Sequence, residues 1–279
     1  MGTNDTIGLL LALGSQRLTQ ASETPRLDAE LLLSHALGVS RAWLVTHEDE
    51  APDAERYYRF IERRAGGEPL AYIVGFKDFW TLRLAITPAV LVPRPETELL
   101  VERALAAMPH DEVKRVVDLG TGSGAIALAL ASERPRWEIT AVDASAEALA
   151  VARANSLALE LPQVELLRGS WFEPLAGRRF DLIVSNPPYI AQFDAVLADP
   201  ALLHEPHVAL SPGADALACL CEIIHDAPQF LERGGWLLLE HGATQAEEVA
   251  GELVARGFHH VTSRRDLAGH ERVTEAQWP

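Results

Sequence analysis

The feature that most constrains the fold is an alternation of short apolar segments with helical segments, which begins near residue 113. Short apolar segments between turn residues are typical of strands that are buried on both faces of a sheet. Because helical segments separate them, most of these strands are expected to pair in parallel, which predicts a doubly wound α/β domain. The strands are expected at residues 113–119, 138–142, 164–167, 181–185 and 236–240, and a final hairpin at 259–263 and 272–276.

The first 71 residues follow a different pattern, in which short helices are separated by capping residues. Thr6 is expected to cap a first helix, residues 26–37 to form a second that ends at Gly38, and Asp53 to cap a third. Together these segments predict a small helical bundle.

Residues 72–112 connect the two regions. A hairpin is expected around residues 79–86, followed by the segment Pro93-Arg94-Pro95 and a helix over residues 96–107. Proline has no backbone N–H to donate, so this segment cannot belong to a central strand. We therefore expect residues 72–112 to form a hairpin-containing linker.

The chain is acidic, with 24 Lys and Arg residues against 40 Asp and Glu residues and a formal charge of −16. Most of that charge lies beyond residue 85, and it disfavours a nucleic-acid substrate, although acidity can also simply aid solubility. No apolar run reaches the roughly 20 residues that a membrane span needs. The two cysteines, Cys219 and Cys221, are expected on different faces of one helix, which argues against a disulfide between them and favours the reducing cytoplasm.

The loop after the first strand of the α/β region reads Asp118-Leu119-Gly120-Thr121-Gly122-Ser123-Gly124. Glycine at every second position lets the chain turn sharply and is expected to bring backbone N–H groups close to a ligand. Asp143 ends the next strand, where a carboxylate can accept both hydroxyl groups of a ribose. The two features indicate a nucleoside site outside the carboxyl ends of these strands.

Two cofactors are compatible with this loop. Ala125 stands at the sixth position of the dinucleotide fingerprint, where alanine is permitted, so the loop alone does not exclude an NAD-dependent dehydrogenase. The rest of the sequence shows no recognisable constellation for hydride transfer. S-adenosylmethionine needs no pyrophosphate cradle and fits at least as well, which favours a methyltransferase.

The segment Asn186-Pro187-Pro188-Tyr189 follows the fourth strand. Its two prolines fix the backbone in an extended form, so that the Asn186 side-chain oxygen and the Pro187 carbonyl can accept the two N–H bonds of a planar amino group. Tyr189 offers a flat face for stacking. This arrangement suits methyl transfer to a planar nitrogen by positioning rather than by a strong base. A purely structural diproline loop is the alternative.

Several segments together resemble one family, the protein-(glutamine-N5) methyltransferases that modify peptide chain release factors. The resemblance runs almost from end to end and implies a class I, Rossmann-like, S-adenosylmethionine-dependent methyltransferase domain at residues 113–279. It also implies that residues 1–71 form a helical domain for substrate recognition. The segments that carry the resemblance are residues 67–72, 93–98, 118–124, 186–189, 266–269 and 271–273.

The resemblance implies a role for each site residue. Gly120, Thr121, Gly122, Ser123, Gly124 and Asp143 would contact S-adenosylmethionine, with Trp171 beside the adenine. Asn186, Pro187, Pro188 and Tyr189 would bind the target glutamine, with Asn186, Pro187 and Tyr189 catalytic and Asn186 also near the cofactor. The implied substrate is the glutamine of the Gly-Gly-Gln loop of class-1 release factors. We expect a cytoplasmic monomer that supports translation termination without a nucleic-acid substrate.

Several other polar residues stand near these motifs in the sequence. His204 and His207 are separated by a proline and lack a third ligand, so no metal site is predicted. Glu240, at the end of the fifth strand, is expected to face water, and a functional carboxylate at this strand end is the alternative. Arg94 and Glu96 are expected either at the rim of the site or in an ion pair within the linker. Two rival functions remain: a nucleic-acid adenine methyltransferase, which needs a basic surface, and a non-catalytic adaptor, which needs none of the motif positions.

Overall fold

The computed structural model describes residues 5–109 and 112–279, which form two compact units. The first unit contains the described residues up to Phe76 together with Asp199–His204, and the second contains the remainder of the described chain. Within the described residues, no helix is both long and apolar enough to cross a bilayer.

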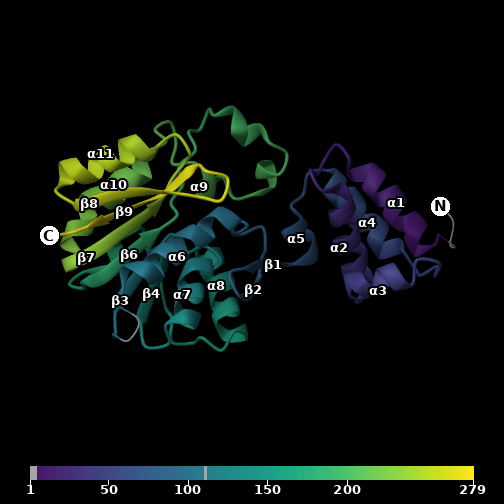
Figure 1. The fold of residues 1–279 in the computed structure, drawn as a ribbon, viewed down its shortest axis with the longest axis horizontal. Helices are drawn as coiled ribbons and strands as arrows, with labels where there is room; N and C mark the ends of the chain where they lie inside the picture. Colours follow the sequence, from purple (N-terminus) through teal and green to yellow (C-terminus); the bar gives the residue numbers. More distant parts are fainter. Residues whose placement is uncertain (1–4, 110–111) are drawn as a thin grey trace. The chain divides into compact units, whose positions relative to one another are not determined.

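The first unit is a bundle of five helices (Figure 1). As predicted, Thr6 caps the first helix by accepting a hydrogen bond from the Leu9 N–H, and Gly38 ends the second in the left-handed conformation. Inside the bundle, the Tyr57 hydroxyl donates to the Leu10 carbonyl at 3.0 Å. The helices are α1 (Ile7–Leu18), α2 (Pro25–Leu37), α3 (Arg41–Thr46), α4 (Glu55–Ala65) and α5 (Leu70–Val74).

The bundle differs from the expectation in three details. Helices α3 and α5 were not predicted, because each has at most six residues and too few positions to show a helical period. The cap residue of α4 is Ala54, and Asp53 instead accepts from the Glu55 N–H at 3.1 Å. Residues 199–204, far along the chain, pack in this unit: a Cβ on Gly67 would lie 2.8 Å from the Cβ of Pro200, so this approach requires glycine.

The second unit is built on one sheet, whose strand order is β5-β4-β3-β6-β7-β9-β8. The first five strands of that order are parallel, and β9 runs antiparallel to both of its neighbours. The strands are β3 (Arg115–Leu119), β4 (Glu138–Asp143), β5 (Glu165–Arg168), β6 (Phe180–Ser185), β7 (Leu231–Glu240), β8 (His259–Arg265) and β9 (Glu271–Gln277).

This sheet confirms the predicted doubly wound α/β fold, including the final hairpin. One strand differs in length: β7 begins five residues earlier than predicted, at Leu231, which pairs with Phe180. The pair Gly234-Gly235 within β7 reads as a turn in the sequence, but here it accompanies an irregularity in the pairing with β6.

Helices cover both faces of this sheet (Figure 1). Helices α6 (Glu98–Ala107), α7 (Ala125–Glu133) and α8 (Ala146–Ala158) pack on one face, and α10 (Ala218–Asp226) and α11 (Ala246–Arg256) on the other. The short helix α9 (His207–Leu210) follows β6 in the chain, and the hairpin β1 (Phe76–Phe79) and β2 (Leu82–Ala85) precedes α6. Cys219 and Cys221 are free thiols on α10.

The strand register brings the chemically informative residues to one edge of the sheet. Leu119 of β3 pairs with Val142 of β4 and with Ser185 of β6, which in turn pairs with Leu239 of β7. The chain order reverses between β3 and β6, and ligands of open α/β sheets bind outside the carboxyl ends of the strands at such a point. The fold therefore places the site at the carboxyl ends of β3, β4 and β6.

Candidate active site

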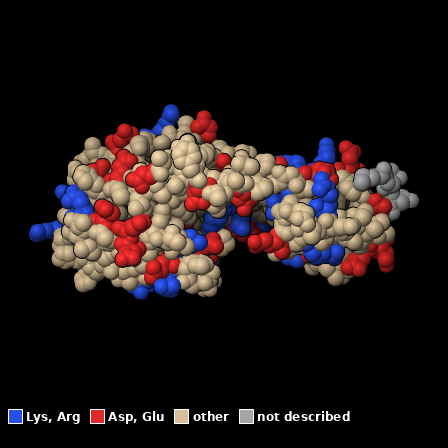
Figure 2. Space-filling view, turned by 90° about the horizontal axis from the view of Figure 1, so that it is seen from above, with Lys and Arg blue, Asp and Glu red and all other residues tan. Residues whose placement is uncertain are grey.

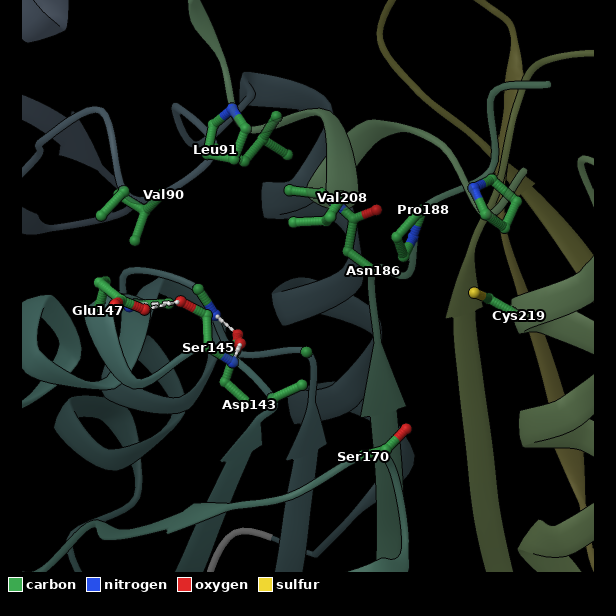
Figure 3. A pocket seen from close by; sticks show the side chains of 18 of the residues that line it. Val90, Leu91, Asp143, Ser145, Glu147, Ser170, Asn186, Pro188, Val208 and Cys219 are labelled. Atoms are coloured by element: carbon green, nitrogen blue, oxygen red, sulfur yellow. Dashed lines mark hydrogen bonds between the residues drawn. The ribbon is translucent and has the colours of Figure 1, made fainter. Parts of the chain in front are cut away.

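A cavity of about 560 Å³ lies at this edge of the sheet. Figure 3 shows Asp143, Ser145 and Glu147 on one side of the cavity and Asn186 and Pro188 on the other. The predicted site residues that line it are Gly120, Gly122, Asp143, Trp171, Asn186 and Pro188. The lining does not include the predicted residues Thr121, Ser123, Gly124, Pro187 and Tyr189.

The glycine loop contributes the shape of the cavity rather than hydrogen-bond donors. Gly120 and Thr121 donate their N–H groups to the Val142 carbonyl at 2.9 and 3.0 Å, Gly122 donates to the Asp143 carboxylate at 2.8 Å, and Gly124 donates to Thr121. These four N–H groups therefore bond within the protein, although Gly120 and Gly122 lie on the cavity lining. A pyrophosphate would need such donors, so the loop suits a cofactor without one.

Space rather than donors is what glycine provides at Gly122. This residue has a φ of 56°, in the left-handed region, and a Cβ built on it would have no atom within 4 Å. A side chain there would project into open space beside the lining. Gly122 thus keeps this part of the cavity clear.

A buried carboxyl group supports the loop from below. Asp118 Oδ2 accepts from the Thr121 hydroxyl at 2.6 Å and from the Ala127 N–H at 3.3 Å. Burial raises the pKa of Asp118 to about 7, against the effect of these hydrogen bonds, and its Oδ1 has no partner among the described residues. Asn155 adds a second support, since its Nδ2 donates to the Ser123 carbonyl at 2.9 Å and to the Ala85 carbonyl of β2 at 3.1 Å.

Asp143 presents an oriented carboxylate to the cavity. Its Oδ1 accepts from the Ser145 N–H at 2.9 Å and its Oδ2 from the Gly122 N–H. Burial raises the pKa of Asp143, while these two backbone bonds lower it. Each carboxylate oxygen accepts more than one hydrogen bond, so capacity remains for the hydroxyl groups of a ligand. Ser145 caps α8, accepting from the Ala148 N–H at 3.1 Å.

Trp171 covers Gly120 with the edge of its indole ring. A Cβ on Gly120 would lie 3.4 Å from Cζ3 of that ring, and the indole Nε1 donates to Glu222 at 3.1 Å. Trp171 has a φ of 43°, a conformation that is strained for a residue with a side chain. The ring is therefore held in a fixed place on the lining.

The Asn-Pro-Pro-Tyr segment is held by four bonds at its ends. The hydroxyl of Ser185 donates to the Leu119 carbonyl at 2.7 Å, and Asn186 Nδ2 donates to the Thr97 hydroxyl at 3.2 Å. The Tyr189 hydroxyl donates to Glu240 at 3.3 Å, and Gln245 donates to the Tyr189 carbonyl at 3.0 Å. Burial, followed by the Glu240 charge, raises the pKa of Tyr189, so the phenol stays neutral.

The Asn186 amide has one free polar atom. Because its nitrogen is bonded to Thr97, its Oδ1 is left as an acceptor, and within the described residues this oxygen accepts no hydrogen bond. The prolines that follow fix the backbone beyond it. The cavity therefore contains two oriented acceptors, the Asp143 carboxylate and Asn186 Oδ1, on opposite sides (Figure 3).

The expectation that Glu240 faces water is wrong. It is 1% exposed, because β7 lies between β6 and β9 and pairs Glu240 with Val273. Burial raises the pKa of Glu240 to about 7, while hydrogen bonding from Thr97 and Tyr189 and the charge of Arg272 lower it. In the sequence, the only signal for this buried contact with Tyr189 is that a carboxylate stands directly at the end of a strand.

Arg94 does not pair with Glu96, and neither residue lines the cavity. Arg94 instead forms an ion pair with Glu205, which also accepts from the Val92 N–H at 3.1 Å. Glu205 is thereby used to hold the proline-rich connector. Among the described residues, no group of three His, Cys, Asp or Glu side chains could bind a metal ion.

Two family models match the chain. The PrmC N-terminal domain matches residues 10–75, and the methyltransferase small domain matches residues 95–215. Among solved structures, the T. thermophilus 16S rRNA N2 G1207 methyltransferase in complex with AdoMet and guanosine is 20% identical, with a TM-score of 0.54. That likeness covers 73% of this chain and 50% of the other chain and shows the fold alone. Fold and site together define an S-adenosylmethionine-dependent methyltransferase.

Closer relatives identify the family. The release factor glutamine methyltransferase of Coxiella burnetii is 48% identical over 94% of this chain and 95% of the relative. The release factor glutamine methyltransferase of Pseudomonas aeruginosa is 50% identical over 92% of this chain and 94% of the relative. The chain therefore belongs to the release factor glutamine methyltransferases.

Proposed function

We propose that this protein transfers a methyl group from S-adenosylmethionine to the side-chain amide nitrogen, N5, of the glutamine in the Gly-Gly-Gln motif of class-1 peptide chain release factors. Such a modification supports translation termination. The observation that carries the proposal is the free acceptor Oδ1 of Asn186, which lines the cavity on the side opposite Asp143. The family of the chain supports the choice of substrate.

Three features of the cavity fit the cofactor. The oxygens of Asp143 suit the two ribose hydroxyl groups, the Trp171 ring suits the adenine, and the open space at Gly122 admits the adenosine without donors for a pyrophosphate. When bound, S-adenosylmethionine supplies an electrophilic methyl group on its sulfonium. We assign the remaining loop residues, Thr121, Ser123 and Gly124, to shaping this site.

The diproline side would bind and orient the glutamine amide. Asn186 Oδ1 and the Pro187 carbonyl accept its two N–H bonds, Pro187 and Pro188 fix those acceptors, and Tyr189 offers a flat face. An amide nitrogen is a poor nucleophile, because its lone pair is delocalised into the carbonyl. Acceptors on both hydrogens increase its electron density and hold the lone pair in line for transfer. The new bond between this nitrogen and the methyl group forms as the bond between the methyl group and sulfur breaks. The methylated nitrogen is then strongly acidic and releases one of its two held protons to water, so no strong base is required.

The substrate and setting follow from the same proposal. The helical N-terminal region, residues 1–71, would bind the release factor outside the reacting loop, and the enzyme would act as a monomer in the cytoplasm. On the face shown in Figure 2, acidic side chains are interspersed with basic ones. The net charge of −16 suits a basic protein substrate and disfavours naked nucleic acid.

The decisive test is transfer of a labelled methyl group from S-adenosylmethionine to a purified class-1 release factor. We expect labelling at the glutamine of Gly-Gly-Gln, identified by mass spectrometry, and none in a release factor in which that glutamine is replaced by alanine. Labelling of DNA or RNA without labelling of the protein would contradict the proposal. Failure to bind S-adenosylmethionine in calorimetry would instead indicate a non-catalytic adaptor.

A further inference from the structure

The two ends of the Asn-Pro-Pro-Tyr segment lead to one buried carboxyl group. At one end, Asn186 Nδ2 donates to the Thr97 hydroxyl at 3.2 Å. At the other end, the Tyr189 hydroxyl donates to Oε1 of Glu240 at 3.3 Å. Thr97 lies beside the Glu240 carboxyl group and lowers its pKa, without an aligned hydrogen bond between the two side chains, and Oε2 has no partner among the described residues. Thr97 and Glu240 are 4% and 1% exposed, so water does not compete for these contacts.

The direction of hydrogen bonding along this connection is determined by its first member. An amide nitrogen can only donate, so the Thr97 oxygen must accept from Asn186. The single proton of Thr97 is then left for another acceptor, and the Glu240 carboxyl group lies beside it. With its nitrogen engaged in this way, Asn186 keeps its oxygen for the cavity.

A purely structural role would not favour a carboxyl group at this position. A buried carboxyl group loses its hydration, and an apolar residue of similar size often serves a core at least as well. The charged groups facing Glu240 are Arg272 on β9 and Glu96 before α6. Arg272 forms its ion pair with Asp266, at 3.1 Å, and Glu96 adds a like charge. Burial of Glu240 is therefore poorly compensated by opposite charge.

We propose that Thr97 and Glu240 are positioning residues, which hold the Asn186 amide and the Tyr189 ring in the orientation that receives the target glutamine. This inference rests on the proposed function for the identity of the target. Neither residue lines the cavity. Thr97 contacts Asn186, which does line it, and Glu240 contacts Tyr189 in the same segment. Thr97 precedes Asn186 by 89 residues in the chain and stands directly before helix α6. The inference also explains why the start of this helix is packed beside the Asn-Pro-Pro-Tyr segment.

The kinetic test compares Thr97→Val, which removes the hydroxyl at nearly constant shape, with Thr97→Ser, which retains it. We expect Thr97→Val to lower kcat for methylation of the release factor by about 10- to 100-fold, because misplacement of a reacting group has effects of this size. Thr97→Ser should restore most of the rate, and cofactor affinity in calorimetry should stay close to that of the wild type in both variants.

Glu240→Gln should lower kcat to a similar extent, and the double variant Thr97→Val/Glu240→Gln should be no slower than the slower single variant. Such non-additivity is the signature of residues that act as one unit. Independent losses that multiply, or a near-normal kcat in Thr97→Val, would overturn the inference. So would an equal loss of kcat and cofactor affinity in Thr97→Val, because that pattern indicates general damage to the fold.

A second measurement separates this inference from the proposed function, since it needs no substrate. The side-chain amide signals of Asn186 can be followed by nitrogen-15 NMR with labelled asparagine and assigned through their absence in Asn186→Asp. We expect the chemical shifts of these signals to change in Thr97→Val and to be close to those of the wild type in Thr97→Ser. They should also change in Glu240→Gln, although Glu240 does not contact Asn186. Unchanged signals in Glu240→Gln would refute the positioning role even if the release factor is the substrate. Absence of methyl transfer by the wild type would refute the proposed function alone.

Discussion

The two sides of the cavity are built differently. On the glycine-loop side, residues 118–124 with Asp143, the N–H groups of Gly120, Thr121, Gly122 and Gly124 bond to residues of the same loop or of β4. On the diproline side, residues 185–189 with Thr97 and Glu240, side chains from three separate parts of the chain determine the orientation. The glycine-loop side is a shaped space with one oriented carboxylate, Asp143, and the diproline side presents one oriented acceptor, Asn186 Oδ1, held by distant parts of the chain.

This difference assigns different consequences to substitutions on the two sides. Changes on the glycine-loop side should alter the affinity for the cofactor and the stability of the loop. Changes on the diproline side should alter the rate of transfer and leave cofactor affinity largely intact.

The largest effect is expected for Asn186→Ala. This variant removes the free acceptor Oδ1, and the rate of methyl transfer should fall by about 100- to 1000-fold, as for the loss of one oriented group that stabilises a transition state. S-adenosylmethionine should still bind measurably in calorimetry. A near-normal turnover would exclude the amide clamp.

Asn155→Ala is the matched control for this variant, because Asn155 is also an asparagine that bonds through its amide nitrogen. Its three hydrogen bonds hold Ala85 and Ser123 together away from the diproline segment. We expect a loss of about 1–3 kcal/mol in the free energy of unfolding. The rate per folded, cofactor-bound molecule should change far less than in Asn186→Ala.

Asp143→Ala should give the largest effect on the glycine-loop side. Loss of a charged acceptor for the ribose is expected to weaken cofactor binding by about 2–3 kcal/mol, or about 30- to 150-fold in Kd. Glu147→Ala is the control, because Glu147 lines the same side of the cavity but is exposed and bonds to Ser145 at the start of its own helix. Equal losses in the two variants would show that general negative charge, and not the oriented carboxylate, binds the cofactor.

The same contrast explains what could be predicted from the sequence. The glycine loop, Asp143 and the Asn-Pro-Pro-Tyr segment stand directly after strands, so a local pattern marks both the turn and the position at the sheet edge. The roles of Thr97 and Glu240 depend on contacts between residues far apart in the chain, and no local pattern reports them. The internal bonding of the loop N–H groups was also hidden, because it requires the Val142 carbonyl of the adjacent strand.

Each side also rests on one buried carboxyl group, and this similarity predicts a pH dependence of stability. Burial raises the pKa of Asp118 and of Glu240 to about 7, whereas in the unfolded chain both titrate near pH 4, about 3.9 for Asp and 4.3 for Glu. Between about pH 4 and 7 the folded state binds protons that the unfolded state does not. The free energy of unfolding should therefore fall as the pH rises through this range and level off above it.

Each group contributes a slope of at most about 1.4 kcal/mol per pH unit. Urea denaturation at pH 5, 6, 7 and 8 measures this slope, and Asp118→Asn and Glu240→Gln should each make it shallower, since the amides do not titrate. The hydrogen bond from Arg178 lowers the pKa of Glu165, so the titration of Glu165 changes the free energy of unfolding only below the range from pH 4 to 7. A slope that neither variant changes would show that the two carboxyl groups are already ionised in the folded protein at pH 5.

The smallest effect concerns the space that the glycine loop keeps open. Gly122→Ala places a Cβ at a φ of 56°, and the strain should lower the free energy of unfolding by about 1 kcal/mol. Gly251→Ala is the matched control, because Gly251 lies inside α11 and a Cβ there also meets nothing within 4 Å. At that position alanine should raise the free energy of unfolding by about 0.5–1 kcal/mol, as expected inside a helix. Only Gly122→Ala should also weaken cofactor binding, because its methyl group projects beside the cavity lining. Stabilisation by both substitutions would mean that the loop can relax away from its left-handed conformation, and the glycine-loop side would then be less rigid than its bonds indicate.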